Sequence, residues 1–272
     1  MPIYNLDDKN SLFYLHSAPT LPDGKTFVFF NALTGDTGMW EGQIGDKLRN
    51  SGHGTLSFNF RGQANSAFSP DTAINADLII EDARRLLGAI TPTNVVLTGL
   101  SIGGLFAARA WLRGIDEIDC RGLVLINTLR RDGPRLKWIN DALVRCAEVG
   151  GLEMFRDFYA PLLFNEDWQE SNRNNFLTSK PYSPLDKSSG HYNLLNNAGD
   201  TDWDFPYENL SLPVLVITGL QDRVFLDHKD VDRLSARIPD VERIDMTNAA
   251  HLLPAERPAE LAETLLTFAG RV

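Results

Sequence analysis

Short apolar segments typical of strands alternate along this chain with segments whose apolar residues recur at helical spacing. The strand-like segments are residues 11–16, 26–31, 54–60, 94–100, 121–128, 213–218 and 241–246. Helical spacing is found at residues 40–50, 75–90, 101–113, 227–237 and 256–269. Such alternation is typical of parallel strands, because each crossover helix returns the chain to the same end of the sheet. The sequence therefore predicts an α/β protein with a mostly parallel sheet and helices on both faces.

The alternation is interrupted between residues 129 and 210, where no comparably strong strand is found. This stretch is rich in aromatic residues, and its candidate helices are 135–149, 152–165 and 166–178. We therefore predict a helical cap at 129–210, inserted into a core made of residues 1–128 and 211–272. Because the cap follows a strand, we expect it to cover the carboxyl ends of the strands, where open α/β sheets bind ligands.

Charge and cysteine content exclude several classes of protein. The chain has 36 acidic and 26 basic residues, a formal charge of −10, which disfavours nucleic acid and anionic membranes as partners. Its two cysteines, Cys120 and Cys146, have no metal-ligand spacing, so we expect no metal site and no disulfide framework. We find no signal-peptide pattern and no run approaching the roughly 20 apolar residues of a membrane span. We expect a cytoplasmic protein without a membrane partner.

A serine lies at the junction of a predicted strand and a predicted helix. Gly99-Leu100-Ser101-Ile102-Gly103 matches the pattern G-x-S-x-G, and Gly104 follows it. The serine of such a motif lies on a sharp turn, and side chains two positions to either side would collide with neighbouring backbone. Glycine at both positions therefore predicts that Ser101 is a nucleophile whose hydroxyl is lifted out of the sheet.

A serine hydroxyl needs a base, and the base needs an acid that orients it. His251 follows the last predicted strand and precedes the last helix, so it is the best candidate for the base. Asp222 lies in the loop after strand 213–218, at the same end of the sheet as Ser101. Asp132, after strand 121–128, is the alternative acid. The sequence thus predicts a triad of Ser101, Asp222 and His251.

The oxyanion formed during acyl transfer needs backbone N–H donors. We predict the amide of Ile102, directly after the nucleophile, and that of Leu33, with Ala32 as the alternative to Leu33. The aromatic cap predicts a mainly apolar pocket with few charges. We expect its lining to include Asn31, Trp138, Phe158 and Leu252.

With these motifs in this order, the chain resembles the α/β-hydrolase superfamily. Its segment 30–44, FNALTGDTGMWEGQI, is similar to the corresponding stretch of 3-oxoadipate enol-lactonases. Asn31-Ala32 stands where most members have His-Gly, and the enol-lactonase group tolerates Asn there. A second departure is the loop after strand 54–60, which keeps Arg61-Gly62 of the frequent D-x-R-G-x-G-x-S pattern but little else. The resemblance implies an eight-stranded sheet, a helical cap after strand 6, and catalysis without cofactor or metal.

The predicted function is hydrolysis of a carboxylic ester or lactone of a small to medium hydrophobic molecule through an acyl-enzyme intermediate. C–C bond hydrolysis and cofactor-free dioxygenation remain alternatives, because both keep the serine and the histidine on this fold. A ligand-binding homologue without catalysis is the alternative of a different class. A small-molecule substrate is the expected partner, and the chain is expected to be a monomer or a homodimer.

Overall fold

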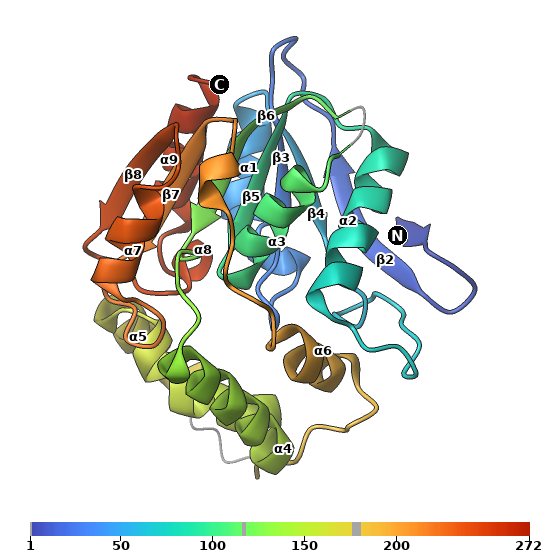
Figure 1. Cartoon of the computed structure of the whole chain (residues 1–272), viewed down its shortest axis with the longest axis vertical. Coiled ribbons are helices and arrows are strands. Elements are labelled where there is room, and N and C mark those ends of the chain that lie inside the picture. Colours follow the sequence, from blue (N-terminus) through green and yellow to red (C-terminus); the bar gives the residue numbers. More distant parts are fainter. Residues whose placement is uncertain (1, 116–117, 176–180) are drawn as a thin grey trace.

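The computed structural model describes residues 2–115, 118–175 and 181–272, and its centre is an eight-stranded sheet (Figure 1). The strand order is β1-β2-β4-β3-β5-β6-β7-β8. β1 (Ile3–Asn5) and β2 (Ser11–Ser17) form the antiparallel edge, and β2 also pairs antiparallel with β4. The parallel strands are β4 (Gly54–Phe58), β3 (Thr26–Phe30), β5 (Val95–Leu100), β6 (Cys120–Ile126), β7 (Val214–Gly219) and β8 (Val241–Met246). The predicted mostly parallel sheet is confirmed.

Helices bury both faces of this sheet because alternate residues of each central strand point to opposite sides. On one face, Phe27 and Phe29 pack in a core with residues of α1 and α9. On the other, Val28 and Phe30 pack with residues of α2, α3 and α7. The bounds of these helices are α1 (Gln43–Asn50), α2 (Ala76–Ile90), α3 (Ile102–Leu112), α7 (His228–Ser235) and α9 (Pro258–Ala269).

Among the described residues between β6 and β7, three α-helices gather at one end of the sheet (Figure 1). They are α4 (Pro134–Leu163), α5 (Glu166–Asn172) and α6 (Gly190–Ala198). The carbonyl of Leu163, at the end of α4, accepts the His251 amide at 3.0 Å, and that of Leu162 accepts the Arg223 amide at 3.0 Å. The insertion is thereby attached to the loops that follow β7 and β8, at the carboxyl ends of the strands.

The insertion differs in detail from the sequence prediction. The predicted helices 135–149 and 152–165 correspond to the two parts of α4, which are joined at a kink where Gly151 has a non-helical φ of 73° and ψ of −166°. α6 was not predicted, and neither was the short edge strand β1. Of the candidate helix 166–178, residues 176–178 lie outside the described part of the chain. Polar, short segments such as α6 carry too little apolar periodicity to be recognised without their packing partners.

Candidate active site

Ser101 lies in the turn that joins β5 to α3, and its backbone is strained. Its φ of 58° and ψ of −126° are rare for a residue with a Cβ atom. A Cβ atom on Gly99 would lie 2.4 Å from the carbonyl carbon of Gly103 and the amide nitrogen of Gly104. A Cβ atom on Gly103 would lie 2.4 Å from the carbonyl oxygens of Phe30 and Asn31. The turn can therefore be this tight only with glycine on both sides of the serine.

The predicted acid and base lie in the loops after β7 and β8 and contact each other. His251 Nδ1 lies 2.7 Å from Asp222 Oδ2, and both side chains are buried. The other oxygen, Oδ1, accepts the backbone amides of Val224 and Phe225, each at 2.9 Å. Burial raises the pKa of Asp222, but His251 and these hydrogen bonds outweigh it and leave the pKa below its usual value. Asp222 is thus held as an anion, suited to orient the histidine ring.

Asn127, one residue after β6, positions the histidine loop. Its side-chain amide donates to the carbonyl oxygens of Ala250 and His251, at 3.0 and 2.8 Å. Its Oδ1 accepts the Gly219 amide at 2.7 Å. Asn127 has a φ of 49°, a region that asparagine tolerates better than most residues. This positioning residue was not predicted from the sequence.

Arg130 is the nearest polar partner of the predicted nucleophile. Its Nη2 donates to Ser101 Oγ at 2.9 Å and to the Asn127 carbonyl at 2.8 Å. Within the described residues, Ser101 Oγ makes no hydrogen bond to His251. Sequence reasoning missed Arg130, although its position soon after strand β6, at the same end of the sheet as Ser101, was a usable signal.

One cavity of about 100 Å³ joins these groups. Ser101, Arg130 and His251 line it, together with Leu33, Ile102 and Leu252. Its other lining residues are Ala32, Thr34, Asn140, Leu143, Phe155, Leu163, Leu195, Gly199, Trp203 and Phe225. Among the described residues, no acceptor is recorded for the backbone amides of Leu33 and Ile102. Both residues line the cavity that Ser101 lines, so their amides remain the predicted oxyanion donors.

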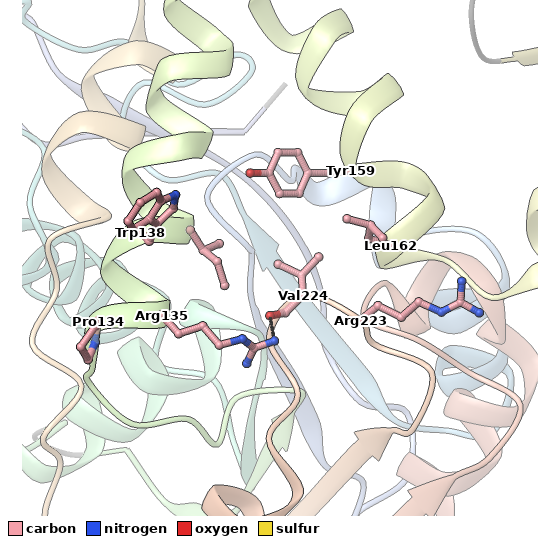
Figure 2. A pocket seen from close by; sticks show the side chains of 8 residues that line it. Pro134, Arg135, Trp138, Tyr159, Leu162, Arg223 and Val224 are labelled. Atoms are coloured by element: carbon pink, nitrogen blue, oxygen red, sulfur yellow. Dashed lines mark hydrogen bonds between the residues drawn. The ribbon is translucent and has the colours of Figure 1, made fainter.

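The remaining predicted pocket residues lie elsewhere. Trp138 is 79% exposed and lines a separate groove of about 440 Å³ between α4 and the loop after β7 (Figure 2). In the described part of the chain, no serine, histidine or carboxylate borders that groove, so we assign the candidate site to the smaller cavity. Phe158 is 60% exposed and borders neither hollow. Neither residue lines the cavity that contains Ser101.

Asn31 is buried in a hydrogen-bond network beneath the cavity rather than in its lining. Its Oδ1 accepts the indole N–H of Trp40 at 2.8 Å, and its amide donates to the Gln63 side chain at 2.9 Å. Gln63 in turn donates to the carbonyls of Ala32 and Leu33, at 2.9 and 3.1 Å. This network supports the loop that carries the predicted oxyanion donor. Asn31, which was predicted to line the pocket, therefore supports the lining loop instead.

Other kinds of site are not evident in the described parts of the chain. Residues 2–115, 118–175 and 181–272 contain no group of three or more His, Cys, Asp or Glu side chains placed to hold a metal ion. Over the same residues, no helix has the length and apolar character needed to span a membrane.

Asp132, the alternative acid, accepts the Trp203 amide at 3.1 Å, whereas Asp222 contacts His251.

Comparison with known proteins places the chain in a family. The model of the α/β-hydrolase fold family matches residues 25–258, and the chain belongs to this family. No curated protein matches its sequence. Among solved structures, it is similar to an α/β-hydrolase enzyme, MGS-M2, from a Medee basin deep-sea metagenome library. That likeness has 17% identity and a TM-score of 0.82, over 100% of this chain and 98% of the other.

Two further structures show the same fold. The enol-lactonase from Burkholderia xenovorans LB400 is 21% identical, with a TM-score of 0.79, over 98% of this chain and 99% of that one. An esterase from Exiguobacterium antarcticum is 18% identical, with a TM-score of 0.78, over 98% of both chains. At these identities the likeness establishes the fold and leaves the substrate open.

Proposed function

We propose that this α/β hydrolase cleaves small carboxylic esters or lactones, with Ser101 as nucleophile, His251 as general base and Asp222 as its orienting acid. The observation that carries the proposal is the buried pair of His251 and Asp222, 2.7 Å apart, with His251 lining the same cavity as the strained Ser101. Structural neighbours that are an esterase and an enol-lactonase are consistent with this chemistry. The small cavity favours a short acyl group.

The reaction follows from the placement of these groups. Asp222 accepts a hydrogen bond from the Nδ1–H of His251 and stays ionised, which leaves Nε2 as the base for the hydroxyl proton of Ser101. Oγ then attacks the carbonyl carbon, and the amides of Ile102 and Leu33 stabilise the resulting oxyanion. His251 gives the proton to the leaving alkoxide, and the acyl-enzyme forms. A water deprotonated by His251 then attacks the acyl group, and Ser101 recovers its proton as the acid is released.

Turnover by matched serine variants tests the proposal. The substrates are 4-nitrophenyl butanoate and γ-butyrolactone, and the variants are Ser101→Ala and Ser171→Ala. Ser171 is an exposed residue of α5, so its loss should leave the rate unchanged. Loss of Ser101 should lower kcat by about 10⁴-fold or more. Equal rates in the two variants, or folded wild type that neither turns over these substrates nor reacts with a fluorophosphonate at Ser101, would overturn the proposal.

A further inference from the structure

A cation is buried beside the predicted nucleophile with no carboxylate hydrogen-bonded to it. The guanidinium of Arg130 lies between two aromatic rings, 4.5 Å from the Trp203 centroid and 4.3 Å from that of Phe225. Only 6% of the residue is exposed. Among the described residues, Arg130 forms no ion pair, and its Nη2 donates only to neutral oxygens, those of Ser101 and Asn127.

Burial disfavours the charged form of the side chain, so a charge kept here suggests a role in binding or catalysis. Burial lowers the pKa of Arg130 to about 10, against the attraction of the Asp222 carboxylate, so the side chain is still a cation at neutral pH. Cation–π contacts recover part of the lost hydration, but they satisfy no N–H group. A buried cation without a paired anion is uncommon in structural roles and more typical of functional sites.

Two unused donors accompany this charge. Arg130 Nε and Trp203 Nε1 are both buried, and neither has a hydrogen-bond partner among the residues that the structure describes. Both residues line the cavity that contains Ser101 and His251. A guanidinium presents its N–H groups in a planar fork that matches a carboxylate, and hydrogen bonds of this kind are about twice as strong as neutral ones.

We propose that Arg130 receives a carboxylate carried by the substrate, so that the preferred esters or lactones are monoanions. This inference rests on the hydrolase function proposed above. Because Nη2 lies 2.9 Å from Ser101 Oγ, a carboxylate on Arg130 stands close to the carbonyl under attack. Hydrogen-bond lengths at both ends leave room for a linker of about two or three carbons between the carboxylate and the scissile carbonyl.

The same contact links recognition to the nucleophile. In the structure, Nη2 of Arg130 donates to Ser101 Oγ. A carboxylate is a stronger acceptor than a hydroxyl, so a bound monoanion draws Nη2 away from Ser101. The Oγ lone pair that Nη2 occupied is then free for attack on the carbonyl carbon. A substrate of this class therefore has a higher kcat as well as a lower KM, whereas a neutral ester of equal length leaves the Arg130–Ser101 contact in place.

The experiment compares substrates that differ only in charge. 4-Nitrophenyl hemiglutarate and 4-nitrophenyl valerate have acyl groups of matched length, and spontaneous hydrolysis of each is subtracted. Carboxymethyl butanoate and propyl butanoate, followed by acid release, place the carboxylate on the leaving group instead. We expect wild type to prefer a monoanion by about 100-fold in kcat/KM, the worth of one or two charge-assisted hydrogen bonds. Wild type that hydrolyses each neutral ester as fast as its anionic partner refutes the inference and leaves the hydrolase proposal standing.

Neighbouring arginines supply a matched control. Arg130→Met should reduce the preference to within a few-fold of unity, and Arg130→Lys should retain part of it because the charge remains. Arg131→Met removes a side chain that is 62% exposed and pairs with Asp230 outside the Ser101 cavity, so the preference should persist. An equal loss in Arg130→Met and Arg131→Met would point to general surface charge and overturn the assignment.

Trp203→Phe provides a second variant if Arg130→Met does not fold. It keeps an aromatic ring beside Arg130 and removes only the buried N–H. We expect its preference for the monoanion to fall by about five- to tenfold, the worth of one hydrogen bond. Competitive inhibition of wild type by free valerate, compared with valeramide, gives the same information without any substitution. Equal inhibition by the two compounds would contradict a carboxylate site.

Discussion

Replacement of Gly103 by alanine tests why the motif around Ser101 needs glycine. Gly103 has no positive φ, so the constraint is space and not backbone dihedrals. An added methyl group would lie 2.4 Å from the carbonyl oxygens of Phe30 and Asn31, and backbone oxygens cannot move aside as a flexible side chain can. Overpacking of this kind costs about 1–3 kcal/mol, or more where backbone must shift. We therefore expect Gly103→Ala to lower the free energy of unfolding by about 2 kcal/mol or more.

Gly88→Ala is the matched control, because Gly88 also lies in a helix but its Cβ atom would meet nothing within 4 Å. That variant should gain about 0.5–1 kcal/mol from helix propensity. Urea unfolding, followed by circular dichroism, measures both changes, and equal m-values are required for the comparison. A displaced turn at Ser101 should also lower kcat, by about 100-fold for a shift of about 1 Å. Gly103→Ala that is as stable and as active as Gly88→Ala would refute the steric reasoning.

Three further substitutions probe the buried charges and the outer groove. Arg61→Met leaves the buried Asp82 without its partner and should cost about 3–5 kcal/mol. Burial already raises the pKa of Asp82 despite Arg61, so stability of this variant should fall as pH rises through that pKa, measured by urea unfolding from pH 4 to 8. Asp222→Asn should lower kcat for 4-nitrophenyl butanoate by about 10⁴-fold while thermal unfolding shows an intact fold, because His251 takes the wrong tautomer. Trp138→Ala should change kcat/KM by less than about twofold, since surface substitutions have small effects; a large loss would mean that its groove belongs to the substrate path.

Sequence reasoning was most successful where chemistry restricts the residue type at a particular position in the fold. Only glycine fits on both sides of the Ser101 turn, so the motif and the flanking strand and helix could be located together. Asp222 and His251 were placed at the carboxyl ends of β7 and β8, and the structure brings their side chains to 2.7 Å. Their catalytic roles remain predictions until the serine variants are measured.

The pocket residues were harder to predict because a helix has several faces and the sequence does not say which one meets the sheet. Trp138 and Phe158 were chosen as large apolar residues of the cap, yet both are exposed, one on each side of the bend of α4 at Gly151. Phe155, on the same helix, lines the cavity instead. The bend depends on a positive φ at one glycine, and Gly150-Gly151 alone gives neither its direction nor its angle.

Arg130 shows why the net charge of a chain is a poor guide to its binding site. A formal charge of −10 spread over the surface is screened by salt within about 10 Å. A charge inside a desolvated cavity is screened far less, so the nearest side chain determines the potential that a substrate meets there. Arg130 is 6% exposed and contacts Ser101 directly, so it contributes more to that potential than the excess of surface carboxylates. An acidic protein can therefore select an anionic substrate, provided that one cation is buried at the point of reaction.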